Sequence, residues 1–311
     1  MIVHFDVDQE IEKYFKDKKY DFSLSKITIS KIKDKDRIKV ISIKSQSTID
    51  GLILKHFPNL KLIITRTVGV NHIDLDICRK NNIKVVNIPD YGASNIAEHA
   101  LALLLAGCRQ IVQADKQVHQ GKFYYSNFLG TALKGKTLGV IGTGKIGLEL
   151  IKLIQNFGLR VICYDIIKNE QAGKKLGFSY ISLEFLLKNS DFISIHVPLL
   201  NSTFHLIGKR EINLMEKGVI LVNTSRGEII DTKALIRHIK KFKAVCLDVV
   251  EGERNFNKNN PLLKYKNIII TPHIGFYTDD SVRVIADKTN KIITNYLKKY
   301  EKPGILDVRH V

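Results

Sequence analysis

Short, almost uninterrupted apolar runs alternate along this chain with longer segments whose apolar residues recur at helical spacing. The runs in the middle of the chain are rich in Val and Ile and show little apolar–polar alternation, which is typical of parallel strands covered on both faces. Six such strands are expected, at 137–142, 161–165, 191–197, 219–225, 244–250 and 267–273. Strands that alternate with helical segments predict an α/β fold with a doubly wound parallel sheet.

A second, smaller α/β series lies near the start of the chain, with expected strands at 38–43, 60–66 and 83–89. A helical pattern from Asp279 to Tyr300 follows the last central strand, and the tail beyond it is too short to form a domain. We therefore expect the tail to return to the N-terminal unit. The predicted organisation is a discontinuous flavodoxin-like domain of residues 1–94 and 276–311 and a Rossmann domain of residues 95–275.

Composition and charge exclude several classes of protein. The chain is 44% hydrophobic, as in ordinary globular proteins, and its longest apolar stretch, Ala100–Cys108, is about half of the ~18 residues that a membrane span needs. The net charge of +18 comes from Lys scattered along the sequence, without a basic stripe interleaved with aromatic residues. We interpret it as a bias spread over solvated faces, and we expect neither nucleic acid nor membrane as a partner.

The chain start indicates a cytoplasmic protein, and the cysteines are expected to be free thiols. The first ten residues place an acid at Asp6 and have no basic cluster before an apolar run, so we expect no signal peptide. The four cysteines stand apart from one another and from any His cluster, which predicts neither a disulfide framework nor a metal site. Cys163 and Cys246 lie in apolar runs and are expected to be buried thiols.

Residues 142–147 read GTGKIG and lie between an expected strand and an expected helix. Gly142 permits a tight turn, Gly144 lets the backbone approach a pyrophosphate, and Gly147 allows close packing of helix and strand. The free N–H groups of the helix N-terminus would then face the phosphates. In this context the motif predicts a dinucleotide site.

Asp165 closes the next expected strand, 18 residues after Gly147. An acid at this place accepts hydrogen bonds from the adenosine ribose and repels a 2′-phosphate. Ile166 and Ile167 follow it, with no Arg beside them, so NAD is favoured over NADP.

Three later segments, at 222–231, 247–253 and 271–278, follow expected strands, where ligands bind in open parallel sheets. Each offers a group that hydride chemistry on a 2-keto acid needs. Arg226 can hold a carboxylate with two parallel hydrogen bonds, and His273 can give or take a proton near neutral pH. Glu253 can hydrogen-bond the imidazole, fix its tautomer and stabilise its protonated form.

The other histidines are less informative. His196 lies inside an apolar run, so we interpret it as a core or pocket-wall residue rather than the acid/base. The pattern names no partner for His99, His119 or His205.

With these motifs in place, the sequence resembles the D-isomer-specific 2-hydroxyacid dehydrogenases over nearly its whole length. The matching motifs occur in the family's order: RTVGVNHID (66–74), NIAEHALALLL (95–105), GTGKIG, SIHVPLLNST (194–203), VNTSRGEIID and TPH. The resemblance implies that Arg226 binds the substrate carboxylate and that His273 is the acid/base. The family's Glu lies five residues after the Asp of the LDV motif, so Asp248 leads to Glu253, whereas the competing Glu251 has the wrong spacing.

The resemblance also implies the residues around the ligands. Besides the GTGKIG loop and Asp165, the expected NAD contacts are Lys145, Ile146, Val197, Pro198, Thr203, Thr224, Ser225 and Asp248, the last on the nicotinamide carboxamide. The substrate is expected to contact Val68, Gly69, Tyr91, Phe276 and Lys44.

Two subgroups of the family, which act on different substrates, are similar to different segments of this chain. DVVEGE, HIGFYT and Tyr91 are similar to the D-lactate dehydrogenases, in which Phe276 would wall a small pocket suited to a methyl group. The segment 43–47, IKSQS, is closer to phosphoglycerate dehydrogenases, but Lys44 and Gln46 keep one cation where that group has two. We expect pyruvate and D-lactate, with phosphoglycerate, glyoxylate or hydroxypyruvate as alternatives.

A corepressor is the alternative function of a non-enzyme class. NAD-sensing corepressors use the same scaffold and keep the Arg, Glu and His of the catalytic set, but their long partner-binding flanks have no counterpart in these 311 residues. A homodimer is expected, because the apolar helix around Ala97–Cys108 has no obvious place in either core and the family dimerises through this segment.

Overall fold

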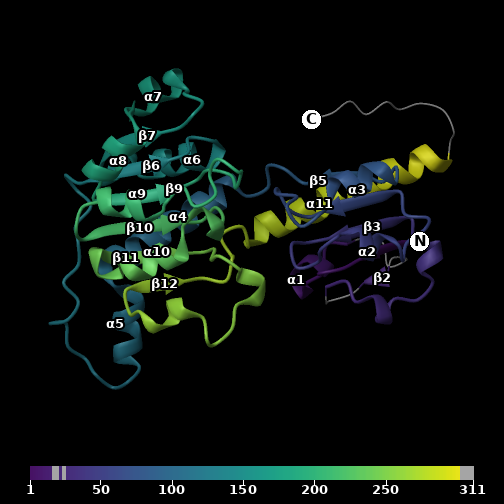
Figure 1. Cartoon of the computed structure of the whole chain (residues 1–311), viewed down its shortest axis with the longest axis horizontal. Helices are drawn as coiled ribbons and strands as arrows, with labels where there is room; N and C mark the ends of the chain where they lie inside the picture. Colours follow the sequence, from purple (N-terminus) through teal and green to yellow (C-terminus); the bar gives the residue numbers. More distant parts are fainter. Residues whose placement is uncertain (16–20, 23–25, 302–311) are drawn as a thin grey trace. The chain divides into compact units, whose positions relative to one another are not determined.

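The computed structural model describes residues 1–15, 21–22 and 26–301, which fold into two compact units (Figure 1). Unit 1 comprises Met1–Tyr91 and Tyr277–Val311, and unit 2 comprises Gly92–Phe276. These divisions lie within about three residues of those expected from the sequence. The expected return of the tail falls on residues 302–311, which lie outside the described residues.

The described part of unit 1 contains a five-stranded parallel sheet with the order β2-β1-β3-β4-β5. This is the strand order of flavodoxin-like folds. The strands are β1 (Ile2–His4), β2 (Asp21–Phe22), β3 (Val40–Ile43), β4 (Leu62–Thr65) and β5 (Lys84–Asn87). The last three correspond to the expected strands, whereas β1 and β2 were not foreseen.

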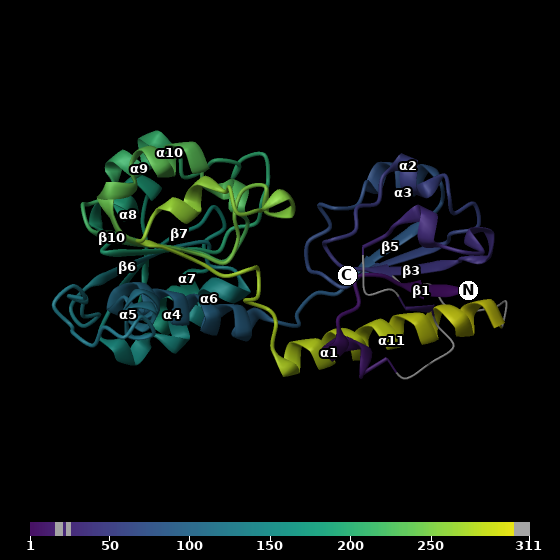
Figure 2. The same cartoon turned by 90° about the horizontal axis from the view of Figure 1, so that it is seen from below.

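The helices of unit 1 are α1 (Gln9–Glu12), α2 (Gly51–Leu54), α3 (Leu75–Lys80) and α11 (Asp279–Glu301). Asp8, Asp50 and Asp74 start the first three by accepting a hydrogen bond from a backbone N–H of the first turn. Figure 2 shows α2 and α3 on one face of the sheet and α1 and α11 on the other. The expected C-terminal helix is therefore present as α11 and belongs to unit 1.

Unit 2 contains a seven-stranded parallel sheet with the order β12-β11-β10-β9-β6-β7-β8 in its described residues. Counted with β6 as the first strand, this is the doubly wound strand order of a Rossmann fold, with β12 added at one edge. The strands are β6 (Thr137–Ile141), β7 (Arg160–Tyr164), β8 (Ser179–Tyr180), β9 (Phe192–Ile195), β10 (Val219–Asn223), β11 (Phe242–Leu247) and β12 (Ile268–Ile270). All six expected strands are present, and the two-residue edge strand β8 was missed.

Helices cover both faces of this sheet (Figure 2). They are α4 (Ala93–Arg109), α5 (Ile111–Val118), α6 (Lys145–Leu153), α7 (Glu170–Leu176), α8 (Leu183–Asn189), α9 (Lys209–Leu214) and α10 (Thr232–Arg237). One core lies between the sheet and α8–α10, and a second lies between the sheet and α4 and α6. Since β9 and β10 are buried along their whole length, they read as continuous apolar runs.

The expectation that the apolar helix around Ala97–Cys108 lacks a place in the core is wrong. In α4, Ala97, Leu104 and Cys108 are fully buried in the second core of unit 2. A Cβ on Gly107 would come within 2.8 Å of Cys246 Sγ, so this helix packs directly on β11. A group of exposed apolar side chains lies just after α4 in the chain, at Ile111, Val112, Val118, Phe123, Tyr124, Tyr125 and Leu129.

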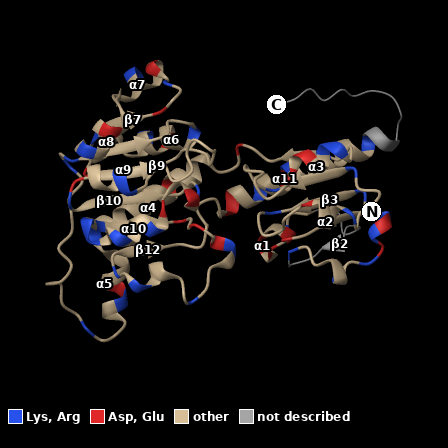
Figure 3. Cartoon of the chain, in the orientation of Figure 1, with Lys and Arg blue, Asp and Glu red and all other residues tan. Residues whose placement is uncertain are grey.

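Charge and cysteines follow the sequence interpretation. Lys and Arg are distributed over helices and loops of both units (Figure 3). Cys78, Cys108, Cys163 and Cys246 are all buried and free. In the described part of the chain, no helix has the length and apolar character of a membrane span.

Candidate active site

The GTGKIG loop joins β6 to α6 at the carboxyl edge of the unit 2 sheet. Gly142 has φ +96°, and a Cβ there would lie 2.7 Å from the His196 carbonyl carbon. A Cβ on Gly147 would lie 2.1 Å from the Gly142 carbonyl oxygen, so both positions exclude side chains for packing reasons. Gly144 differs: no described atom lies within 4 Å of its Cβ position. The backbone at the start of α6 is therefore open to a ligand, as a phosphate-binding loop requires.

Asp165 follows directly after β7 and stands beside this loop. Its Oδ2 accepts hydrogen bonds from the Thr143 amide, at 2.6 Å, and the Thr143 hydroxyl, at 3.0 Å, and its Oδ1 accepts one from the Ile167 amide. A carboxylate offers about four acceptor sites, so capacity for a ribose hydroxyl remains. Ile166 and Ile167 are exposed. Asp165 thus occupies the place expected of a ribose ligand.

The ends of β9 and β10 carry most of the other expected cofactor residues. Thr224 is only 7% exposed, and its Oγ1 has no hydrogen-bond partner among the described residues. Since buried hydroxyls are normally satisfied, this orphan atom fits a polar ligand group. Neighbouring Ser225 donates to Ile195 O at 2.8 Å, and Thr203 donates to Pro198 O, so these two hydroxyls shape the loops. The cradle as a whole fits a dinucleotide.

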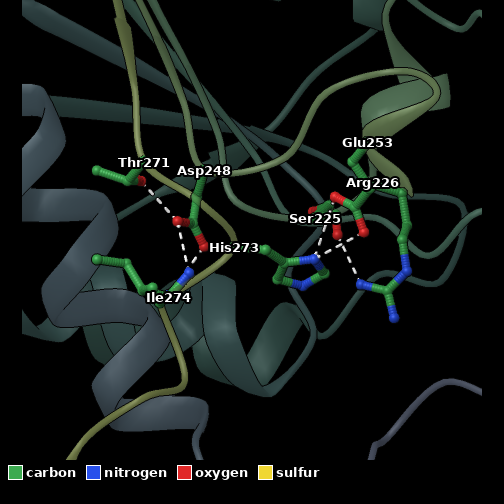
Figure 4. A network of polar contacts seen from close by, with 8 residues as sticks. Ser225, Arg226, Asp248, Glu253, Thr271, His273 and Ile274 are labelled. Carbon is green, nitrogen blue, oxygen red and sulfur yellow. Dashed lines mark hydrogen bonds and ion pairs between the residues drawn. The ribbon is translucent and has the colours of Figure 1, made fainter. Parts of the chain in front are cut away.

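His273 and Glu253 lie in contact although they come from the loops after different strands. His273 Nδ1 is 3.0 Å from Oε1 and 3.2 Å from Oε2 of Glu253, and the two side chains point toward one another (Figure 4). An ionised carboxylate only accepts hydrogen bonds, so Nδ1 carries a proton in this pair. Nε2 is thereby left as the nitrogen that can bind or release a proton.

Arg226 extends from the loop after β10 in the same view (Figure 4). Its Nη1 donates to Ser225 O at 2.6 Å, and it is half-buried. A Cβ on the following residue, Gly227, would lie 2.0 Å from the Val250 carbonyl carbon and 2.2 Å from the Glu251 nitrogen. The SRG motif therefore needs its glycine so that the loop can pack on the backbone that leads to Glu253.

Asp248 is 2% exposed and organises the loop that carries His273. Its carboxylate accepts hydrogen bonds from Thr271 Oγ1 and from the Ile274 and Gly275 amides, and its carbonyl oxygen accepts one from the His273 amide. Burial acts to raise the pKa of Asp248, but hydrogen bonds from His99, Thr271 and the loop amides outweigh it and hold the pKa below its usual range.

His99 and His205, for which the sequence named no partner, each contact a carboxylate. His99 Nε2 lies 3.0 Å from Thr271 Oγ1 and 3.2 Å from Asp248 Oδ1. His205 Nε2 lies 2.9 Å from Glu251 Oε1. Glu251 also accepts from the Thr232 amide, and these bonds outweigh the effect of burial, so the pKa of Glu251 is lowered. Glu251, the competitor of Glu253, is thus engaged with a different histidine.

His196 is buried, as expected from its place in an apolar run. Its Nε2 contacts Ser194 Oγ at 2.8 Å. Burial lowers the pKa of His196 to about 4, so the ring is neutral near neutral pH and is a poor proton donor there. His119, by contrast, is an exposed residue next to Asp115.

The expected substrate residues are divided between the units. Phe276 belongs to unit 2, not to the smaller domain as expected, and its ring lies edge-on to His273 with 6.4 Å between ring centroids. Val68 and Gly69 follow β4 in unit 1, where Asn87 Nδ2 donates to Val68 O. Tyr91 closes the first segment of unit 1, and its carbonyl oxygen accepts from Ser281 Oγ.

Lys44 follows β3 in unit 1 and is paired with an acid that the sequence reading did not consider. Its Nζ lies 3.1 Å from Asp8 Oδ2 and 5.3 Å from the centroid of the Tyr277 ring. Burial lowers the pKa of Lys44, against the opposing effect of Asp8. A pocket of about 310 Å³ beside this pair is lined by Asp6, Val7, Asp8, Gln9, Lys44 and Gln46.

Comparisons with known proteins agree with this geometry. Residues 101–275 match the family model of the D-isomer specific 2-hydroxyacid dehydrogenase NAD binding domain. Glyoxylate reductase of Thermococcus litoralis is 39% identical over 268 residues, which cover 83% of this chain and 80% of the relative. D-3-phosphoglycerate dehydrogenase of Archaeoglobus fulgidus is 39% identical over 80% of this chain, which spans only 48% of that longer protein.

Solved structures give the same result. A D-lactate dehydrogenase of Aquifex aeolicus, complexed with NAD and lactic acid, superposes with a TM-score of 0.85 at 36% identity, and 96% of each chain is covered. A pyruvate reductase of Chlamydomonas reinhardtii superposes with a TM-score of 0.88 at 29% identity, again over 96% of each chain.

Proposed function

The chain belongs to the D-isomer-specific 2-hydroxyacid dehydrogenases, and we propose that within this family it interconverts pyruvate and D-lactate. NAD is its cofactor, and it is an oxidoreductase. The choice of pyruvate depends above all on one observation, the pairing of Lys44 with Asp8.

In the proposed mechanism, Arg226 holds the substrate carboxylate with its planar guanidinium and polarises the neighbouring carbonyl. His273 gives its Nε2 proton to the carbonyl oxygen during reduction and takes it back during oxidation. Glu253 keeps the imidazole in the Nδ1-protonated form and stabilises its positive charge. The cofactor, when bound, would supply a hydride to C2 of the keto acid as NADH and would accept one from C2 of the hydroxy acid as NAD.

The substrate's third substituent is proposed to meet Lys44 in unit 1. A phosphorylated acid carries about two negative charges there and needs unpaired cations around it. Lys44 is already neutralised by Asp8 at 3.1 Å, so a phosphate would meet the Asp8 carboxylate as well as the ammonium group. This arrangement disfavours phosphoglycerate. The Phe276 ring beside His273 supports a small apolar substituent such as the methyl group of pyruvate.

Glyoxylate is the second candidate, because several of the matched relatives are glyoxylate reductases. Its C2 carries only hydrogen in place of the methyl group, so the same residues can hold it. The preference between the two depends on how well the Phe276 side of the pocket is filled, since one buried methyl group is worth ~1 kcal/mol or more.

A panel of 2-keto acids with NADH tests the proposal, with pyruvate, glyoxylate, hydroxypyruvate and 3-phosphohydroxypyruvate compared by kcat/KM at the nicotinamide absorbance. We expect pyruvate to be best and the phosphorylated acid to be worst, and chiral analysis should find D-lactate. A preference for 3-phosphohydroxypyruvate would overturn the proposal, and a preference for glyoxylate would establish the second candidate.

The Asp8→Asn variant tests the argument from charge. Asn is as good a helix N-cap as Asp, so α1 should be retained while Lys44 loses its counter-charge. Activity with 3-phosphohydroxypyruvate should rise relative to pyruvate. Glu10→Gln is the matched control, because Glu10 also forms an ion pair near the start of α1, but with exposed Lys13. An unchanged ratio in Asp8→Asn would show that Lys44 does not meet the substrate.

We also propose that the chain is a homodimer. Support comes from the exposed apolar side chains at 111–129 rather than from α4, which is buried within unit 2. Phe123 and Tyr125 are 91% and 89% exposed, and exposed apolar clusters of this kind mark interaction surfaces. Light scattering at micromolar concentration should give twice the mass of 35.3 kDa, and Phe123→Ser with Tyr125→Ser should give the monomer. A monomeric parent chain would contradict the proposal.

A cytoplasmic location is the last part of the proposal. The four free, buried cysteines fit a reducing compartment, where thiols persist. Cell fractionation with an antibody to the chain tests it, and recovery in a membrane or secreted fraction would contradict it.

A further inference from the structure

His99 lies on α4, outside the loops that carry the proposed catalytic residues, yet it contacts two of the groups that shape them. Its Nε2 is 3.0 Å from Thr271 Oγ1, on the loop after β12, and 3.2 Å from Asp248 Oδ1, on the loop after β11. Three separate elements of unit 2 therefore meet at this imidazole.

The direction of these hydrogen bonds follows from the donors available. Thr271 Oγ1 has one proton, which it donates to Asp248 Oδ1 at 2.5 Å. The Asp248 carboxylate, whose pKa is held below its usual range, is an acceptor only. His99 Nε2 must then carry a proton and donate it to both oxygens. The ring thus supplies Asp248 with a side-chain donor from outside the loop.

The loop that Asp248 holds has a conformation that needs support. His273 has φ +56°, in the left-handed region that residues other than glycine adopt only at a cost in free energy. Asp248 binds this loop at Thr271, His273, Ile274 and Gly275 through its carboxylate and its carbonyl oxygen.

His99 also touches the loop by packing. The Cβ position of Gly275 is 3.0 Å from Asp248 Oδ2 and 3.3 Å from His99 Cδ2, so a side chain there would crowd both groups. The imidazole therefore packs against the loop as well as donating a hydrogen bond.

We propose that His99 is a positioning residue, which fixes the Asp248 carboxylate and through it the left-handed loop that aims the His273 imidazole. The proposal rests on the proposed function only where turnover is the readout. In metal sites, residues that orient a ligand side chain by a hydrogen bond contribute ~10–100-fold to activity, and we expect an effect of the same order for a residue that orients the His273 loop. Loss of the donor should therefore lower kcat by that amount and change KM for the keto acid by less than about threefold, because Arg226 is not touched.

Three substitutions at one position separate the donor from the bulk of the ring. His99→Gln places an amide nitrogen close to the position of Nε2 and should keep kcat within about threefold of the parent chain. His99→Leu fills the space without a donor, and His99→Asn carries a donor that is too short to reach Asp248. Both should lose ~10–100-fold in kcat. If His99→Leu fails to fold, the contrast between Gln and Asn still decides.

His238→Leu is the matched control, because His238 is also half-buried in unit 2, and among the described residues its ring bonds only Ala234 O in the helix that it caps. It should leave kcat unchanged. Equal kcat in the parent, His99→Leu and His99→Asn would overturn the proposal. So would a loss in His99→Gln as large as in His99→Leu, since the donor would then not be what matters.

A second readout does not require turnover. The Ile274 and Gly275 amides donate to Asp248, so hydrogen exchange of the segment 271–276 reports how firmly it is held. Exchange there should speed up in His99→Leu and His99→Asn but not in His99→Gln. Unchanged exchange in all three would overturn the positioning role, whereas an inactive parent chain with these exchange differences would overturn only the proposed function.

Discussion

Replacing Glu253 by Gln should displace the pH dependence of the reaction while leaving the hydrogen bond to His273 in place. The Gln amide oxygen can still accept from Nδ1, which lies 3.0 Å from Glu253 Oε1 in the parent chain. The imidazole therefore keeps its tautomer. What the variant removes is the negative charge that stabilises the protonated ring.

The size of the effect follows from distance and exposure. The His273 and Glu253 side chains are 32% and 37% exposed, so solvent screens the pair, and the carboxylate stabilises the charged ring by on the order of 1 kcal/mol. Reduction needs the protonated ring, so its rate falls as pH rises, and this fall should occur at lower pH in the variant. Oxidation needs the neutral ring, so its rise should also begin at lower pH and the rate near neutrality should suffer less.

The assay is the pH–rate profile in both directions, with NADH and pyruvate and with NAD and D-lactate. Glu251→Gln is the control, because Glu251 contacts His205 instead of His273, and both of its limbs should stay in place. An unshifted reduction limb in Glu253→Gln would refute the pairing with His273. A shifted limb in Glu251→Gln would show that the charge near the imidazole comes from elsewhere.

Three other substitutions follow from the same site. His273→Ala should lower kcat by ~10²–10⁴-fold, measured by steady-state turnover at saturating keto acid, because His196 is buried and neutral and cannot replace it. Arg226→Lys should lower kcat/KM by ~10–100-fold, with KM raised and kcat reduced, since an ammonium group loses one of two charge-assisted hydrogen bonds to the carboxylate. The parent chain should prefer NADH to NADPH by ~10-fold or more because Asp165 repels a 2′-phosphate, and Asp165→Ser should narrow that ratio; a preference for NADPH in the parent would remove Asp165 from this role.

The fold could be predicted wherever a strand lies in a segment rich in Val, Ile and Leu. Every strand from β3 to β12 except β8 lies in such a segment. β2 and β8 have two residues each, too few to show a pattern, and both lie at a sheet edge. β1 was missed although it lies inside the sheet, because buried His4 interrupts its apolar run. Periodicity also shows that α4 has an apolar face but not what covers it, so a core helix was taken for an interface helix.

The site could be predicted only as far as single residues at strand ends reveal it. Arg226 and His273 each follow an apolar run, and parallel strands bring such ends to one edge of the sheet. His99 was out of reach because its partners depend on tertiary packing: Thr271 is 172 positions away in the chain. His205 was missed for the same reason, since Glu251 lies 46 positions further on.

One glycine explains why two glutamates only two residues apart contact different histidines. In a regular strand, residues 251 and 253 would point the same way, and either could reach His273. Gly252 instead has φ +70°, a conformation that glycine adopts without strain, and a short 3₁₀ turn begins at Glu253. The chain direction therefore changes between the two acids. Glu251 stays against His205 and the Thr232 amide, where it anchors the segment, while Glu253 is carried over to His273. Because of this turn, the two glutamates lie on opposite sides of the loop. The five-residue spacing from Asp248 therefore identifies Glu253, and not Glu251, as the partner of His273.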